Sequence, residues 1–179
     1  MRKSAADRIL EAREKRAELI DKMINEYKKP LLVMRVNYPG LKKNNELTIG
    51  IMEDMDKVIC DTLGSKSYKK TITSGVEGPI LYMVVSEDAI MLKEIAIELE
   101  ENHILGRCLD IDIYDIEGKG ISRKQLGYEV RKCYLCNDYA QTCVRAKVHS
   151  EEEVIAFIKK RYKEYIEVKK ENFKEYSRF

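Results

Sequence analysis

The sequence predicts one α+β domain over residues 1–179, made of an antiparallel sheet and helices. The length is close to one ordinary domain of roughly 150 residues. Hydrophobic residues make up 44% of the chain, which is enough apolar surface to form a core. Apolar residues recur at helical spacing in some segments and alternate with polar residues in others, and these two periods identify the elements.

Five segments have the apolar spacing of helices, and most begin at a capping residue and end at Pro or Gly. The first follows Ser4 and ends at Pro30, and Ile9, Arg13, Arg16, Ile20, Met23 and Tyr27 share one of its faces. The others run from Asn45 to Gly64, from Ser86 as N-cap to about His103, from Asp138 to Val148, and from the capping box Ser150–Glu153 onward.

Four segments have the character of strands, namely Pro30–Pro39, Tyr68–Ser74, Pro79–Val85 and Cys108–Asp115. The last alternates strictly, with Leu109, Ile111 and Ile113 on one face. In chain order, residues 30–115 give strand, helix, strand, strand, helix, strand. This order predicts a ferredoxin-like βαββαβ antiparallel sheet with flanking N- and C-terminal helices.

Charge and hydropathy exclude several classes of protein. The 33 Lys and Arg residues nearly balance 31 Asp and Glu residues, for a net charge of +2, so nucleic acid is not an expected partner. No apolar run approaches the roughly 20 residues that cross a bilayer, and the amino-terminal stretch is too charged for a signal peptide. We therefore expect a cytoplasmic protein without a membrane partner.

The strongest candidate site is the pair Asp110 and Asp112. Their carboxylates lie on the same side of a strand, roughly 6.5 to 7 Å apart along the backbone, so both can reach one or two divalent ions between them. Gly106, which lets backbone approach a phosphate, and Arg107, a planar donor suited to phosphate oxygens, come just before them. This pattern favours magnesium and phosphoryl chemistry, although an Asp-x-Asp pair on an exposed strand is often only solvated.

Arg13 and Arg16 interrupt the apolar face of the first helix. Either their long side chains reach a solvated edge, or they point into a cleft that binds phosphate.

The five cysteines include a cluster of Cys133, Cys136 and Cys143, followed by His149. These four residues are formally a zinc set. If one helix carried Cys136 and Cys143, however, they would lie about 10 Å apart, too far for one ion, unless the chain breaks near Asn137. We expect reduced thiols, with structural zinc as the alternative.

Residues 97–149 strongly resemble the CitX family, the synthases that install the prosthetic group of citrate lyase. The long block from IELEENHILGRCLDIDIYD to CVRAKVH carries most of the resemblance, and REKR at Arg13–Arg16 and NYPG at Asn37–Gly40 extend it.

The resemblance implies a nucleotidyl-type transferase. Its donor would be 2'-(5-triphosphoribosyl)-3'-dephospho-CoA, and its acceptor a serine of the citrate lyase acyl carrier protein (gamma subunit), with release of diphosphate. Asp110 and Asp112 would hold magnesium, Arg107 would meet phosphate charge, and a carboxylate or His103 would accept the serine proton. The substrate-binding candidates are Gly106, Arg13, Arg16, Arg123, Arg145 and His149. A nucleotidyltransferase of other specificity and a non-catalytic carrier-binding module are the alternatives.

Overall fold

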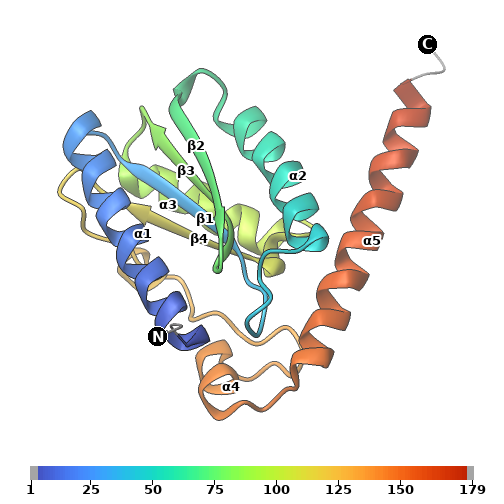
Figure 1. The fold of residues 1–179 in the computed structure, drawn as a ribbon. Coiled ribbons are helices and arrows are strands. Elements are labelled where there is room, and N and C mark those ends of the chain that lie inside the picture. The colour runs from blue at the N-terminus through green and yellow to red at the C-terminus, as the bar shows by residue number, and fades with distance from the viewer. Residues whose placement is uncertain (1–3, 177–179) are drawn as a thin grey trace.

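The computed structural model describes residues 4–176, which form a sheet with helices on both faces (Figure 1). The strands are β1 (Leu31–Val36), β2 (Ser67–Gly75), β3 (Gly78–Val85) and β4 (Leu109–Tyr114). The helices are α1 (Ala5–Tyr27), α2 (Glu46–Leu63), α3 (Ala89–Asn102), α4 (Ala140–Ala146) and α5 (Glu151–Tyr176). The strand order is β2-β3-β1-β4, and every neighbouring pair is antiparallel. The mixed α/β class and the antiparallel sheet are confirmed, and the ferredoxin-like assignment stays a prediction.

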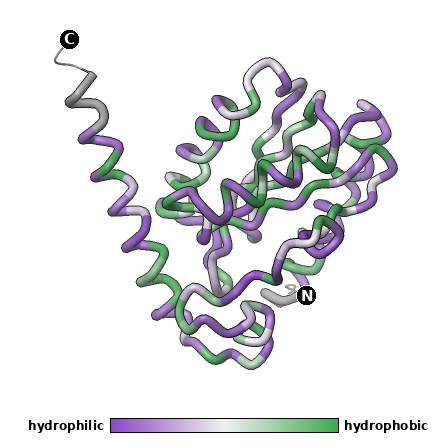
Figure 2. The backbone as a smooth tube through the Cα atoms, turned by 180° about the vertical axis from the view of Figure 1, so that it is seen from behind, coloured by the Kyte–Doolittle hydropathy of each residue, from purple (hydrophilic) through white to green (hydrophobic). Residues whose placement is uncertain are grey.

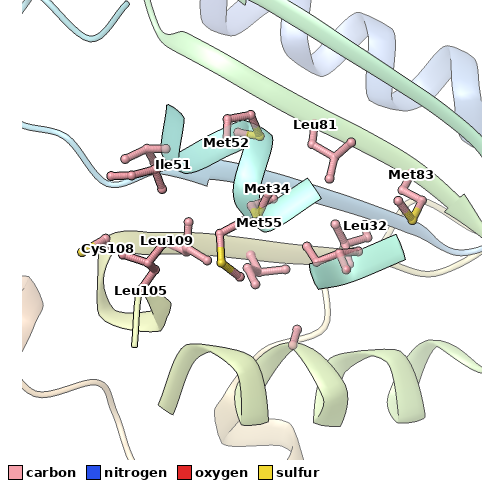
Figure 3. Packing of buried hydrophobic residues seen from close by; sticks show 14 of the residues in the cluster. Leu32, Met34, Ile51, Met52, Met55, Leu81, Met83, Leu105, Cys108 and Leu109 are labelled. Atoms are coloured by element: carbon pink, nitrogen blue, oxygen red, sulfur yellow. The ribbon is translucent and has the colours of Figure 1, made fainter. Parts of the chain in front are cut away.

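The larger core lies between the sheet and the layer of α2 and α3. Side chains that alternate along β1 and β3 meet the apolar faces of these helices, as Figure 3 shows for Met34, Leu81 and Met55. Helix α5 joins this side of the molecule through Ile158, which is fully buried. Hydrophilic and hydrophobic residues intermingle along the rest of α5 (Figure 2). None of the described helices is long and apolar enough to span a membrane.

Helix α1 covers only part of the opposite face. Ile20, Met23 and Ile24 in its second half pack against Val33 and Tyr82 of the sheet. The helix thus leaves the charged residues of β1 and β4 to line a polar region.

Helix α3 protects the free edge of β4. The Lys93 ammonium donates to the backbone oxygen of Ile111 at 3.0 Å, and the Ile111 amide donates to the Glu100 carboxylate at 2.9 Å. Both helical side chains are buried. They satisfy backbone groups that would otherwise be free to pair with another chain, and they fix the position of β4.

Three predicted elements had wrong boundaries. The first strand ends at Val36 rather than Pro39, because the Tyr38 amide turns back to the Val36 carbonyl and leaves the sheet ladder. The N-cap of α3 is Asp88 rather than Ser86, since the Asp88 carboxylate accepts from two amides of the first turn. The helix predicted from Asp138 to Val148 covers only Ala140–Ala146, between left-handed residues at Asn137 and Lys147.

Candidate active site

Asp110 and Asp112 lie on the face of β4 that α2 and α3 do not cover. The alternation of side chains along the strand buries Leu109, Ile111 and Ile113 and leaves the two carboxylates half-exposed. The predicted alternation is therefore confirmed. The two carboxylates share a surface on which they can act on the same ligand.

Arg35 is the cationic partner of both carboxylates, and sequence analysis did not single it out. It stands directly opposite Asp110 in the pairing of β1 with β4. Its Nη2 donates to Oδ2 of Asp110 and lies 3.5 Å from Oδ2 of Asp112. A signal was present in the sequence, because Arg35 is the single charged residue in the apolar segment Leu31–Val36.

Groups of like charge lie close together around Arg35 and the two carboxylates. Partial desolvation of the half-exposed Asp112 carboxylate raises its pKa, and the neighbouring Asp110 carboxylate raises it further, while Arg35 opposes both effects. Burial also lowers the pKa of Lys43, and the nearby cations Arg35 and Arg13 add to that shift. Both anions and cations are therefore held close to groups of their own sign, an arrangement that bound counter-charges would relieve.

The structure separates Arg13 from Arg16. Arg16 donates from Nη1 to the Glu77 carboxylate at the tip of the β2–β3 hairpin, and its side chain is only 19% exposed. The Arg13 side chain is 62% exposed, and its Nε lies 3.8 Å from the same Glu77 oxygen. Arg16 lines a pocket of about 230 Å³ together with Glu77 and Tyr82. Arg16 thus lies toward the polar region, and Arg13 lies mainly in solvent.

Two buried polar atoms of this region lack a hydrogen-bond partner within residues 4–176, namely Nε of Arg35 and Oε2 of Glu77. Buried polar atoms are nearly always paired, so an unpaired one requires a specific explanation. One of these atoms is a donor beside the carboxylate pair, and the other is an acceptor beside Arg16. Each of these two atoms therefore has an unused hydrogen-bonding capacity, at the buried edge of the region around Arg35 and Arg16.

The residues that lead into β4 are held mainly by protein contacts. Gly106 is buried, and a side chain there would overlap the carbonyl oxygen of Leu99 at the end of α3. Arg107 donates to the Lys132 carbonyl. His103 accepts at Nδ1 from the Leu105 amide at 3.1 Å. Within residues 4–176, no hydrogen bond, ion pair or ring contact joins His103 to the Asp pair.

Comparison with known proteins places the chain in a family. The family model described as apo-citrate lyase phosphoribosyl-dephospho-CoA transferase matches residues 5–165. The chain belongs to this family. The match covers both the carboxylate strand and the cysteine cluster, and it confirms the resemblance to CitX proteins.

Two of the curated relatives match this chain over most of their own length, and a third is a longer protein. A probable apo-citrate lyase phosphoribosyl-dephospho-CoA transferase of Vibrio cholerae serotype O1 is 29% identical over 163 residues, 89% of this chain and 92% of that protein. The apo-citrate lyase phosphoribosyl-dephospho-CoA transferase of Escherichia coli O7:K1 is 30% identical over 144 residues, 79% of each chain. Protein CitXG of Haemophilus influenzae is 30% identical over 156 residues, which are 86% of this chain but 34% of that longer protein.

In this CitX-family chain, Arg123 belongs to a buried ion cluster around Glu100. The Glu100 carboxylate is 2% exposed and accepts from Arg123 at 2.6 Å and from Arg131 at 3.2 Å. Arg131 also donates to the Leu109 carbonyl at 3.0 Å and approaches Asp110 at 4.0 Å. The cluster connects the end of α3 to β4. Both guanidinium groups of the cluster therefore contact protein carboxylates, and the substrate-binding role of Arg123 stays a prediction.

The last candidates lie after β4. Arg145 is exposed on α4 and lines a shallow pocket with Val130 and Tyr139. His149 approaches the Cys136 sulfur at 3.2 Å. His149 also lines a cavity of about 520 Å³ that includes Tyr38 and Lys43 after β1 and Lys147 after α4. Lys43 thus lines this cavity and also lies near Arg35 and Arg16. We call the group of Arg16, Arg35, Lys43, Asp110 and Asp112 the charged region.

Proposed function

We propose that this chain transfers the phosphoribosyl-dephospho-CoA group from 2'-(5-triphosphoribosyl)-3'-dephospho-CoA to a serine of the citrate lyase acyl carrier protein. Membership of the family and the names of the relatives support the group transferred and the protein that receives it. The observation that supports a location for the active site is the sheet face that α1 covers only in part. On this face Arg35 contacts Asp110 and Asp112 and has an unpaired Nε.

The reaction requires little covalent chemistry from the enzyme. The serine oxygen of the carrier forms a bond to the α-phosphorus of the donor, and the bond from that phosphorus to the leaving diphosphate breaks. The serine proton passes to a base. Because the partner supplies the nucleophile, the enzyme must mainly position the two substrates and stabilise phosphate charge.

Cations of the charged region suit the triphosphate. Arg35 and Arg16 offer guanidinium groups, and Lys43 lies near both, as their effect on its pKa indicates. Bound phosphate oxygens would accept from Arg35 Nε and would relieve the repulsion among these three cations. We assign Arg35, Arg16 and Lys43 to the triphosphate.

Asp110 and Asp112 fit a magnesium ion. Their oxygens are the donors that the ion prefers, and mutual repulsion contributes to the raised pKa of Asp112. When bound, magnesium would neutralise charge on the leaving diphosphate. One carboxylate of this pair, rather than His103, would accept the proton of the serine hydroxyl. Nδ1 of His103 already accepts a hydrogen bond from the Leu105 amide.

We assign the dephospho-CoA part of the donor to the cavity of about 520 Å³ that shares Lys43 with the charged region. Its volume lies within the usual range of about 300–1,000 Å³ for ligand pockets. Tyr38 offers an aromatic surface, and Lys147 a second cation.

The test is the conversion of apo carrier protein to its holo form, followed by intact-mass spectrometry. We expect purified protein, magnesium and the triphosphate donor to increase the mass of the carrier by the phosphoribosyl-dephospho-CoA group, and ATP in place of the donor to give no increase. Transfer from ATP would instead support a nucleotidyltransferase of other specificity. Tight carrier binding without any mass change would support a carrier-binding module. Either outcome would overturn the proposal.

A further inference from the structure

Cys133, Cys136, Cys143 and His149 come together in space although they spread over residues 133–149. One candidate ligand atom from each residue can be chosen so that all four lie within 4.8 Å of one another. The Cys136 and Cys143 sulfurs are 3.4 Å apart, and Nε2 of His149 is 3.2 Å from the Cys136 sulfur. All of these cysteines are free thiols.

These distances are close to those around a tetrahedral zinc ion. With zinc–sulfur bonds of about 2.3 Å and zinc–nitrogen bonds of about 2.0–2.1 Å, sulfurs are about 3.8 Å apart, and a sulfur and a nitrogen about 3.6 Å apart. The observed sulfur–sulfur and sulfur–nitrogen separations, 3.4 and 3.2 Å, are each slightly shorter than these values, and all four ligand atoms lie within 4.8 Å of one another, so small side-chain rotations would complete the tetrahedron. Three thiolates and an imidazole are also a donor set that zinc prefers.

Local backbone geometry explains how the sequence forms this cluster. Asn137 has a left-handed backbone with φ of 62°, and its amide donates to the Cys133 carbonyl at 3.2 Å. This tight turn brings Cys136 back toward α4, which carries Cys143. The separation of about 10 Å expected for a continuous helix therefore does not apply. Within the turn, the Leu135 amide donates to the Cys133 sulfur at 3.4 Å, the kind of hydrogen bond that orients a metal-bound thiolate.

Burial supplies a second, independent argument. In residues 128–150, the buried side chains are Cys133 and Cys143, whereas Tyr139, Val144 and Val148 are 53%, 74% and 54% exposed. This segment, which we call the cysteine lobe, therefore has almost no apolar core of its own. A lobe of this size ordinarily needs a disulfide or a metal to hold its shape.

We infer that the cysteine lobe is a structural zinc site, with Cys133, Cys136, Cys143 and His149 as its four ligands. All four positions of the ion are filled by protein, so the site has no open position for substrate and is structural rather than catalytic. Three thiolates leave the zinc complex with one negative charge, and Lys147, which lines the same cavity as Cys133 and Cys143, offsets it.

The zinc site would also shape the donor cavity. Cys133, Cys143 and His149 belong to the wall of the cavity of about 520 Å³, which Lys43 also lines. Tyr134, next to the first ligand, stacks on Phe157 of α5 with ring centroids 4.3 Å apart and joins the lobe to the rest of the protein. Zinc would thus hold one wall of the cavity in place. The inference about zinc itself does not depend on the proposed reaction.

The test begins with elemental analysis of the full-length protein purified without added metal. We expect about one zinc per chain, lost in Cys136→Ser and kept in Cys60→Ser, whose thiol lies on α2 outside the lobe. Three results would overturn the inference: a protein without zinc, a protein that holds iron or copper instead of zinc, or the same zinc content in both variants.

A second measurement avoids any variant that fails to fold. The wild-type protein is stripped with a chelator and titrated with cobalt(II), and the thiolate-to-cobalt absorption reports sulfur ligands. We expect saturation at about one cobalt per chain, together with slower amide hydrogen exchange in the cysteine lobe and unchanged exchange in β1. No thiolate band, or no change in exchange in the lobe, would contradict a structural metal there.

Discussion

Replacing Glu100 with Ala tests the ion cluster that supports β4. The carboxylate is 2% exposed and accepts hydrogen bonds from the Ile111 amide, Arg123 and Arg131. Its removal leaves two guanidinium groups, with side chains 12% and 20% exposed, facing a small cavity. It also leaves a buried strand amide without its acceptor.

The expected loss can be worked out from these contacts. Removing one partner of a buried ion pair costs about 3–5 kcal/mol. Arg123 keeps Glu101 and Arg131 keeps the Leu109 carbonyl, so we expect the lower end, about 3 kcal/mol of unfolding free energy. For a chain of this size, that loss lowers the melting temperature by roughly 6–12 °C.

Urea unfolding followed by circular dichroism measures this effect. Glu100→Gln is the matched control, because its amide oxygen still accepts from Ile111 while the charge is gone, so we expect an intermediate loss. A change below about 1 kcal/mol for Glu100→Ala would refute the reasoning, since it would mean that the two arginines find other partners at no cost.

Three further predictions concern single side chains. Arg16→Leu should weaken donor binding and also lower thermal stability, since it leaves the buried Glu77 carboxylate poorly paired; an unchanged KM for the donor would contradict the assignment. His103→Gln should keep turnover within about tenfold of wild type and leave the pH profile unchanged, whereas a loss of 10²–10⁴-fold would restore His103 as the base. Burial raises the pKa of the Cys108 thiol to about 12, so iodoacetamide at pH 8 should alkylate Cys60 far faster, and equal rates by peptide mass spectrometry would disprove this.

The parts of the fold that sequence predicted are those with a clear period. Strict alternation in β4 identified both its buried residues and the outward-facing pair Asp110 and Asp112. Capping residues such as Ser4 and Asn45 located the starts of helices, because their side chains satisfy amides that the first turn leaves free.

The parts that sequence did not predict depend on pairing between distant segments. The sequence shows Arg35 as a single charge in an apolar segment, but its position beside Asp110 comes from the register that pairs β1 with β4. The environment of Arg16 depends on the distant Glu77 in the β2–β3 hairpin. The cysteine lobe differs from these two cases, because it depends on a local turn at the left-handed residue Asn137, near which the sequence analysis placed a break as the alternative to a continuous helix. For Arg35 and Arg16 the deciding contact joins residues for which spacing along the chain gives no information.

The most direct test of the proposed active site compares Asp112→Asn with wild type in the carrier assay. Asn preserves the shape of the side chain and removes its charge, and Asp61→Asn on the exposed face of α2 serves as the control. We expect the initial rate of carrier mass increase to fall by about 10²–10⁴-fold for Asp112→Asn, with an unchanged melting temperature, and to remain at the wild-type level for Asp61→Asn. Transfer by Asp112→Asn at the wild-type rate in saturating magnesium would contradict a reaction centred on this carboxylate pair.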